Sequence, residues 1–202
     1  DGQEYVGDMG RDPEALPRFY RFLEAGKLPQ TSQINVGTYL DFFEAQLEKG
    51  DLLHIAFTSG QSGSVHNAVA AAKLLQEKYP DKKLVVIDSL CSSSGYGLLV
   101  DAAADLRDSG ATLEETARWV LENRNKVHHQ FFSSNMTQFR RTGRVSGAAA
   151  MVATIMNICP IMRLDDKGAI KAYSKVRGKK KAVETTVNVM EQHAQGGRDY
   201  DQ

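Results

Sequence analysis

The hydroxyl-rich segment TSGQSGS, residues 58–64, has the side chains best suited to holding a polar group. Four of its seven residues carry a hydroxyl, none carries a positive charge, and Gly60 and Gly63 allow the backbone to approach a ligand closely. Hydroxyls and free N–H groups at the start of a helix suit a carboxylate or a carbonyl better than a triphosphate. The simpler alternative is a strand-to-helix turn whose serines cap the helix, and both interpretations stay open at this point.

Two enzymatic interpretations of the same loop are weaker. Residues 60–64 resemble a G-x-S-x-G nucleophile elbow with Ser62 as the nucleophile, but Ser64 replaces the final glycine. The sequence identifies no histidine as the base that would activate Ser62, because His66 lies only one turn into the following helix. A nucleotide site needs a glycine-rich phosphate motif that the chain lacks, which leaves Asp88 as the one suggestive residue. A serine hydrolase using Ser62 is therefore the alternative function.

The other candidate positions have plain structural explanations. The TSQ segment at residues 31–33 precedes a helix, so a helix cap is the favoured interpretation. His54 lies inside a strand, where a histidine is more often a satisfied core residue than a ligand, and no Cys/His/Asp cluster has the spacing of metal ligands. The basic run at 175–181 is typical of a solvated face. Together with the arginines of 140–144 it could form a rim for an acidic protein partner or a phosphate.

Two strand–loop–helix units position the hydroxyl-rich loop. The apolar runs at residues 52–58 and 84–88 predict buried parallel strands, and each leads through a short loop into a helix. The loop is therefore expected at the carboxyl end of a parallel sheet, where open α/β folds bind ligands. The helices expected in this half cover residues 13–23, with Asp12 as a cap, then 36–48, 65–79, 98–107 and 112–125, the last opening with a Thr112–Glu115 capping box.

The second half is predicted to be α+β, with a domain boundary near residue 126. The domains are then expected at residues 1–126 and 127–202. The elements expected in the second are a short strand at 131–132, a basic loop at 140–144, an apolar helix at 148–156, strands at 158–164 and 169–174 joined by a turn at 165–168, and a helix at 180–193.

Composition narrows the class of protein. The 202 residues are 42% hydrophobic and 25% charged, and the formal net charge of +0 favours neither nucleic acid nor an anionic membrane. No apolar run approaches the ~20 residues that span a bilayer. Cys91 and Cys159 are far apart, and Cys159 lies in an apolar run, which predicts free thiols in a reduced, cytoplasmic setting. The opening residues, DGQEY, look like the interior of a longer chain.

Taken in order, these segments resemble the DegV family. The matching motifs are TSQ at 31–33, IAFTSGQSGS at 55–64, VIDS at 86–89, GRV at 143–145, the run 158–162 and KVRGKKKA at 175–182. Each motif alone is weak, but six in sequence across about 150 residues are specific. The resemblance implies a two-domain α/β protein, in which a three-layer α/β/α domain with a parallel sheet precedes a two-layer α/β domain with a mixed sheet.

The resemblance also implies a function without catalysis. One long-chain fatty acid is expected between the two domains, with its carboxylate held by the hydroxyls of Thr31 and Ser62, and with Ser59 and Gly63 completing the site. The chain is then a bacterial lipid-binding protein that uses no cofactor and no metal. A third alternative is a structural or regulatory protein that copurifies with lipid by accident.

The partner implied by the resemblance is a separate fatty acid kinase, which phosphorylates the bound carboxyl group to an acyl phosphate. Its docking residues correspond to Arg144, Arg177 and Lys179 of this chain. The expected partners are thus a long-chain fatty acid and a kinase subunit, without nucleic acid or a transmembrane segment, and a transient membrane contact is left open.

The chain departs from the family pattern in four places. The family usually opens with a strand ending in Asp-Ser and continues past a point like Gln202, so both ends are expected to be truncated. Thr58 stands where serine is common, and residues 34–35 are Ile-Asn in place of the usual Pro-Ser. The substitution at Thr58 keeps a hydroxyl in the loop.

Overall fold

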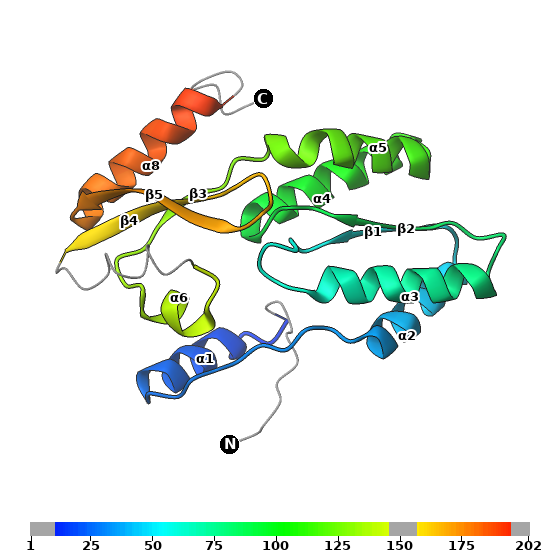
Figure 1. Ribbon diagram of the computed structural model, residues 1–202, viewed down its shortest axis with the longest axis horizontal. Coiled ribbons are helices and arrows are strands. Elements are labelled where there is room, and N and C mark those ends of the chain that lie inside the picture. Colours follow the sequence, from blue (N-terminus) through cyan, green and yellow to red (C-terminus); the bar gives the residue numbers. More distant parts are fainter. Residues whose placement is uncertain (1–10, 146–156, 195–202) are drawn as a thin grey trace. The chain divides into compact units, whose positions relative to one another are not determined.

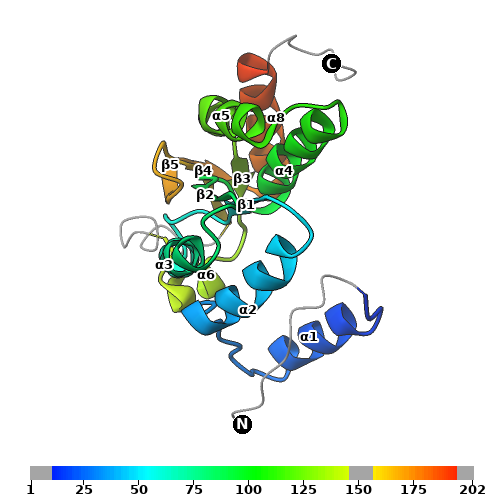
Figure 2. The same ribbon diagram turned by 90° about the vertical axis from the view of Figure 1, so that its right-hand side faces the viewer.

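The structure is a computed structural model that describes residues 11–145 and 157–194 (Figures 1 and 2). It divides into two compact units, Asp1–Ser32 and Gln33–Gln202, and each unit is described by itself. In the first unit, helix α1 spans Ala15–Glu24, close to the helix expected there.

Asp12 stabilises the entry to helix α1 from just outside it. Its carboxylate accepts the Glu14 N–H at 2.9 Å and forms an ion pair with Arg18 at 3.0 Å. The structure assigns the N-cap position to Glu14, so the expected cap at Asp12 lies two residues early although its carboxylate does bind a free N–H group.

The second unit contains a parallel sheet between two layers of helices. In this sheet Leu52 lies opposite Leu84, and Ala56 lies opposite Asp88. The strands are β1 (Leu52–Ala56) and β2 (Leu84–Asp88). One face is covered by α2 (Val36–Leu47) and α3 (Ser64–Lys78), and the other by α4 (Ser93–Asp108) and α5 (Leu113–Asn123), which leads into the short 3-10 helix η1 (Arg124–Lys126) (Figures 1 and 2).

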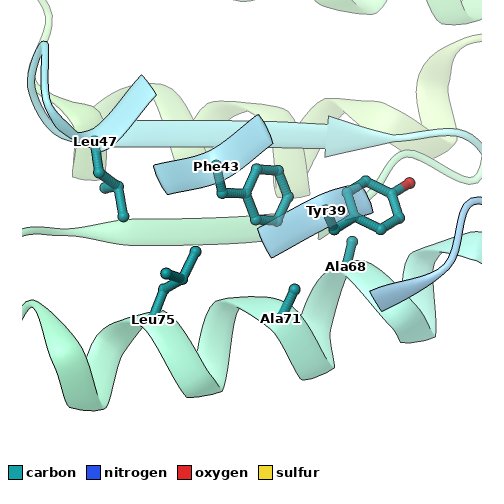
Figure 3. Close-up of a cluster of buried hydrophobic side chains, with 6 residues drawn as sticks. All are labelled: Tyr39, Phe43, Leu47, Ala68, Ala71 and Leu75. Atoms are coloured by element: carbon teal, nitrogen blue, oxygen red, sulfur yellow. The ribbon is translucent and has the colours of Figure 1, made fainter. Parts of the chain in front are cut away.

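Alternation along the strands divides the core of this part into two clusters. Leu84 and Val86 pack against α2 and α3, whereas Val85 and Ile87 pack against α4 and α5. In the first cluster, side chains of α2 meet those of α3, as Figure 3 shows for Tyr39, Phe43, Leu47, Ala68, Ala71 and Leu75. A two-sided apolar pattern of this kind is what a parallel sheet covered by helices on both faces requires.

His54 is a core residue that lacks a full set of hydrogen bonds. Its ring lies 5.5 Å from the ring of Tyr39 and 5.0 Å from that of Phe43, centroid to centroid. Its Nε2 atom is buried and has no hydrogen-bond partner among the described residues. Burial therefore lowers the pKa of His54. The expectation of a core histidine is correct, but this histidine is only partly satisfied.

We expect the unfolding free energy to fall as the pH drops below about 6.5, because the unfolded chain then binds a proton that folded His54 resists. The pKa of His54 is lower in the folded chain than in the unfolded chain. At a pH above the unfolded pKa, His54 therefore does not reduce the free energy of unfolding. As the pH falls from the unfolded pKa towards the folded pKa, His54 lowers the free energy of unfolding. Urea unfolding between pH 7.5 and 5 would measure this slope, which should be shallower in His54→Phe. The slope should not disappear in His54→Phe, because burial also lowers the pKa of His129 and this residue contributes in the same direction. Equal slopes in the two proteins would contradict the assignment.

The second sheet contains a hairpin that was predicted from its turn. Strand β3 (Gln130–Phe132) pairs antiparallel with β4 (Ile158–Leu164), which pairs antiparallel with β5 (Ile170–Arg177). An isolated parallel bridge joins Val145 to Ile170, so the sheet has both kinds of pairing. Helix α8 (Lys179–His193) covers one face through Ala182, and Phe139 of the short helix α6 (Thr137–Thr142) packs on the other.

Several expected elements differ from the observed ones. Strand β1 ends at Ala56 because the Thr58 N–H turns to the Cys91 carbonyl at 3.2 Å, outside the paired strands. Helix α4 begins at Ser93, five residues before the expected start, and the basic loop expected at 140–144 is in part the helix α6. The apolar helix expected at 148–156 lies outside the described residues.

Hydrogen bonds cross the expected domain boundary near residue 126. His129 Nε2 lies 3.2 Å from the Ser92 N–H, and the Thr58 hydroxyl donates to the Gly168 carbonyl at 3.1 Å. The division into domains at 1–126 and 127–202 stays a prediction.

Both cysteines are buried and free, as expected. Burial raises the pKa of the Cys91 thiol to about 11, so this thiol stays protonated at neutral pH. Across residues 11–145 and 157–194 no helix has the length and apolar character needed to cross a membrane.

Candidate functional site

Thr58 fastens the hydroxyl-rich loop to the β4–β5 turn. Its side chain is fully buried, and its hydroxyl donates to the Gly168 carbonyl at 3.1 Å while accepting the Gly60 N–H at 3.1 Å. Gln61 adds a longer contact, 3.4 Å from its Nε2 to the same carbonyl. This buried hydroxyl is satisfied within the protein, and its only proton is used, so Thr58 has a structural role and cannot donate to a ligand.

Gly60 and Gly168 allow two stretches of backbone to touch at this point. A Cβ atom on Gly60 would lie 2.4 Å from the Gly168 carbonyl carbon and 2.6 Å from the Ala169 nitrogen. The approach therefore depends on the missing side chain, and it brings residues more than 100 positions apart into one site.

Asp88, at the end of strand β2, holds the loop from the other side. Its Oδ1 atom accepts the Ser59 N–H at 3.1 Å and the Leu90 N–H at 3.0 Å. This carboxylate is therefore engaged within the protein, which weakens the nucleotide interpretation that relied on it. Ser59 lies in this loop, and the hydrogen bond from its N–H to the Asp88 carboxylate positions its backbone.

The last part of the loop carries Ser62 and Ser64 in contact with each other. Their Oγ atoms lie 3.0 Å apart, and the Ser64 N–H donates to the Ser62 Oγ at 3.3 Å. The Ile34 N–H donates to the Ser64 Oγ at 3.2 Å, and the Asn67 amide donates to the Ile34 carbonyl at 2.7 Å. The segment just before helix α2 therefore lies against the loop.

Gly63 lies beside Gln33, the last residue of the TSQ motif. A Cβ atom on Gly63 would meet the Gln33 side-chain amide nitrogen at 2.7 Å. Gly63 is also the N-cap residue of helix α3, and no side chain caps that helix. The backbone at Gly63 is thus open to close approach, as expected from its residue type.

The two helix-cap alternatives fit the structure poorly. The cap of α2 is Asn35, whose side chain accepts the Thr38 N–H at 2.9 Å, so the TSQ motif is not the cap. Ser62 precedes the N-cap of α3, and it makes a single longer contact to the first N–H of the helix. The hydroxyls of the loop are therefore not explained by capping.

The serine hydrolase alternative lacks a base. The Ser62 hydroxyl forms hydrogen bonds with the hydroxyl and the N–H of Ser64, and within the described ranges no histidine or carboxylate bonds to it. His66 is exposed on helix α3, and His129 is engaged with Ser92. A nucleophilic serine needs a base within hydrogen-bond reach, and the described residues supply none to Ser62.

The predicted docking residues are not gathered in one place, and Thr31 is not placed relative to the loop. Thr31 is exposed and belongs to the first unit, which is described by itself. Arg144 is exposed and precedes Val145, which bridges to Ile170 at the start of β5, whereas Arg177 ends the same strand. Seven residues of strand correspond to roughly 23 Å, so the basic positions form two separate places and no single cluster.

Reasoning from the sequence missed Gly168, Ile34 and Ser64 as parts of the site. Gly168 appeared only as a turn residue, and its contact with Thr58 spans 110 positions, for which a single sequence carries no signal. Ser64 stood in the loop, but its pairing with the Ile34 backbone depends on tertiary structure. Ile34 was marked only as a departure from the family pattern.

The described residues of the second unit enclose two hollows. One, of about 470 Å³, is lined by residues that include Arg124, His128, Arg163 and His193. The other, of about 600 Å³, is lined by residues between Gln76 and Leu121, and neither contains a residue of the loop. In the described part of the chain no group of three or more His, Cys, Asp or Glu side chains could hold a metal ion.

Comparison with known proteins points to one family. A family profile described as "Uncharacterised protein, DegV family" matches residues 1–201. A DegV domain-containing protein of Clostridium perfringens is 33% identical over 193 residues, covering 95% of this chain and 66% of that protein. The DegV domain-containing protein YteA of Lactococcus lactis is 35% identical over 181 residues, covering 89% and 62%.

Solved structures share the fold. A DegV lipid binding protein from Thermotoga maritima matches with a TM-score of 0.78 at 29% identity, over 91% of this chain and 63% of that one. A Thermus thermophilus DegV family protein, whose structure is described for its fatty acid binding, matches with a TM-score of 0.77 at 28% identity, over 89% and 63%. The Fatty Acid Kinase (Fak) B3 protein of Streptococcus pneumoniae, loaded with linoleic acid, matches in fold with a TM-score of 0.78 at 24% identity, over 88% and 63%.

The fold and the loop define a two-sheet α/β protein with a hydroxyl-rich loop at the carboxyl end of a parallel sheet. The chain belongs to the DegV family. The expected fold class and the family resemblance are thereby confirmed. The chain spans about two thirds of the length of the relatives that it matches, with 66% and 62% covered in the two cited above.

Proposed function

We propose that this chain binds one long-chain fatty acid and that the Ser62 hydroxyl holds its carboxylate. The observation that carries the proposal is the uncharged loop itself, which is fixed by Thr58 and Asp88 and has the Ser62 hydroxyl without a base beside it. Ser59 and Gly63 complete the head-group site with backbone and hydroxyl groups. The DegV proteins of Thermotoga maritima and Thermus thermophilus, described as lipid-binding and fatty-acid-binding, support this assignment.

Thr31 is proposed as the second hydroxyl on the carboxylate. It stands two residues before Gln33, and Gln33 approaches the loop at Gly63. The acyl chain is proposed to lie between the domains expected at 1–126 and 127–202, away from water.

Hydrophobic burial supplies most of the affinity in this proposal. An acyl chain of about 15 methylenes contributes up to roughly 12 kcal/mol at ~0.8 kcal/mol for each CH₂, before the cost of association. The head-group site therefore needs only to satisfy and orient the carboxylate. Hydroxyls do so without a buried lysine, and they leave one carboxylate oxygen free for a partner.

The partner we propose is a separate fatty acid kinase that phosphorylates the bound carboxyl group. This chain has no phosphate-binding motif of its own, and the fold of the Streptococcus pneumoniae Fatty Acid Kinase (Fak) B3 protein is similar. Arg144, Arg177 and Lys179 are proposed to contact the kinase, and all three are exposed. Because they form two places on the second sheet, the kinase would have to contact both ends of β5. The chain itself is proposed to be a carrier and no enzyme, in the cytoplasm.

Ser62→Ala should weaken the binding of oleate about tenfold, because one hydrogen bond to a charged group is lost while the acyl chain stays buried. Titration of delipidated protein with oleate would measure the dissociation constant. Ser94→Ala, on the exposed first turn of helix α4, is the control and should leave the affinity unchanged.

Two results would count against this proposal. An unchanged oleate affinity in Ser62→Ala would remove the hydroxyl from the site, and turnover of an activated ester that Ser62→Ala abolishes would favour the hydrolase. The carrier predicts stoichiometric binding without turnover in both proteins.

A further inference from the structure

Tyr39 places a polar atom at the edge of an apolar core. Its side chain is only 6% exposed and packs in the cluster between helices α2 and α3. Its ring contacts those of Phe43 and His54, whereas among the described residues its hydroxyl has no hydrogen-bond partner. A phenylalanine would fill the same space without a polar atom, so packing alone does not explain the hydroxyl.

The Tyr39 oxygen is open to a small molecule. In the described residues the side-chain polar atoms that are both fully buried and unpaired belong to His54, Thr116 and Arg124. The Tyr39 oxygen is not one of them, so the small exposed part of this residue includes its hydroxyl. Burial raises the pKa of Tyr39, and the nearby Tyr96 phenol adds to this effect. The hydroxyl therefore keeps its proton at neutral pH and can donate.

The Tyr39 hydroxyl points towards the end of the sheet that carries the hydroxyl-rich loop. Helix α2 precedes strand β1 and helix α3 follows it, so both helices begin at the carboxyl end of the parallel sheet. Tyr39 is the fourth residue of α2, and aromatic side chains on a helix lean towards its N-terminus. In Figure 3 the Tyr39 ring lies near the arrowhead of strand β1, with its oxygen directed away from Phe43 and Leu47.

Two contacts place the start of helix α2 beside this loop. The Ile34 N–H donates to the Ser64 Oγ at 3.2 Å. Tyr39 shares a cluster with Ala68, which lies one helical turn, about 5.4 Å, beyond Ser64 on helix α3 (Figure 3). Because the phenol leans back by the same direction, it approaches the turn that holds Ser64 and its neighbour Ser62.

We propose that Tyr39 is a further donor of the head-group site, whose hydroxyl binds the fatty acid carboxylate together with that of Ser62. This inference rests on the proposed function, in which Ser62 meets the head group. A phenol donates one hydrogen bond and a carboxylate accepts several, so Tyr39 and Ser62 do not compete. The hydrogen bond is assisted by the charge of the carboxylate, and it forms beside an apolar cluster, where it is stronger than in water.

Tyr39→Phe removes this oxygen alone, and it tests the proposal on the delipidated 202-residue chain. Oleate should bind about fivefold more weakly, and oleyl alcohol only about twofold, because hydrogen bonds to a neutral acceptor are roughly half as strong. The melting temperature without ligand should change by less than about 2 °C, since no hydrogen bond among the described residues is lost. If Tyr39 only supported the core, both ligands would be weakened alike.

Tyr79→Phe is the matched control at the other end of helix α3. The Tyr79 hydroxyl donates to the Glu44 carboxylate. Tyr79 is the C-cap residue of this helix, roughly 22 Å from its first turn. The control should lower the melting temperature by about 2–4 °C and bind oleate like the wild type, which is the reverse of the effect expected for Tyr39→Phe.

A carbon-13 label at the tyrosine Cζ atoms gives a second readout that a structural role would not move. The NMR signal that disappears in Tyr39→Phe belongs to Tyr39. Oleate should shift this signal more than oleyl alcohol does, because the carboxylate is the stronger acceptor. Equal shifts with the two ligands would show that the phenol does not meet the head group.

The outcomes distinguish this inference from the proposed function. If Ser62→Ala weakens oleate but Tyr39→Phe binds it like the wild type, the role of Tyr39 alone is overturned. Equal losses for oleate and oleyl alcohol in Tyr39→Phe would also overturn it, as a structural effect. A wild-type chain that binds neither ligand, or a Ser62→Ala variant that binds oleate normally, would overturn both.

Discussion

Gly168→Ala should destabilise the chain by about 3 kcal/mol, because it combines backbone strain with a collision. Gly168 has φ = +70°, a conformation that side chains disfavour, and its Cβ would lie 1.9 Å from the Thr58 Oγ1 and 2.9 Å from the Leu90 carbonyl. Thr58 is fully buried and holds the start of the hydroxyl-rich loop, so it cannot move aside. Urea unfolding would measure the loss of stability.

Gly143→Ala is the matched control for the strain alone. Gly143 has φ = +68°, but a Cβ there would meet nothing within 4 Å. It should therefore lose only about 1 kcal/mol, which is the conformational part. The two variants should also differ in fatty acid binding, because only Gly168→Ala displaces the loop that we assign to the carboxylate. Equal losses of stability in the two variants would show that the contact between Gly168 and Thr58 is not formed.

Phe43→Ala should cost about 3–5 kcal/mol of unfolding free energy, the range for removing a buried aromatic ring. The Phe43 side chain is 0% exposed and lies beside Tyr39 in the cluster of Figure 3. Its ring centroid is 5.2 Å from that of Tyr39 and 5.0 Å from that of His54. A void at this position would open the layer between helix α2 and the parallel sheet. Thermal and urea unfolding would both register the change.

The neighbouring residue provides an internal control for this prediction. Phe42 is 54% exposed on the same helix, so Phe42→Ala should change the stability by less than about 1 kcal/mol. If Phe42→Ala were the more damaging of the two, helix α2 would have to present its other face to the sheet.

Elements with strong local patterns were predictable from the sequence. The run LVVID predicted strand β2 at 84–88, and the residues DDKG predicted the turn of the β4–β5 hairpin at 165–168. The Thr112–Glu115 capping box is formed as expected. In each case neighbouring residues determine the conformation, so no distant contact is needed to infer it.

Elements that depend on distant contacts were not predictable. The start of helix α4 at Ser93 lies in a run of small residues that looks like a loop, yet Tyr96 within it donates to the Ile55 carbonyl at 2.7 Å. Helix α6 is short, and its sequence is polar and basic, so no apolar period marks it. A helix cap was predicted at the TSQ motif, whereas Asn35 caps helix α2.

The candidate site shows the same division. Ser59, Ser62 and Gly63 could be predicted for the site because they lie within seven residues of one loop, which the sequence displays directly, and their role stays a prediction. The contacts that hold this loop come from Asp88 and Gly168, which are distant in the sequence. The residue types of a binding loop are visible in one sequence, whereas the groups that orient them appear only after folding.

Native mass spectrometry of the purified chain, with extraction and identification of any bound molecule, tests the central claim most directly. We predict a mass increase equal to one long-chain fatty acid for each chain, released on denaturation and regained when oleate is added back. A folded chain that carries no lipid and fails to bind added oleate or palmitate would contradict the fatty acid carrier.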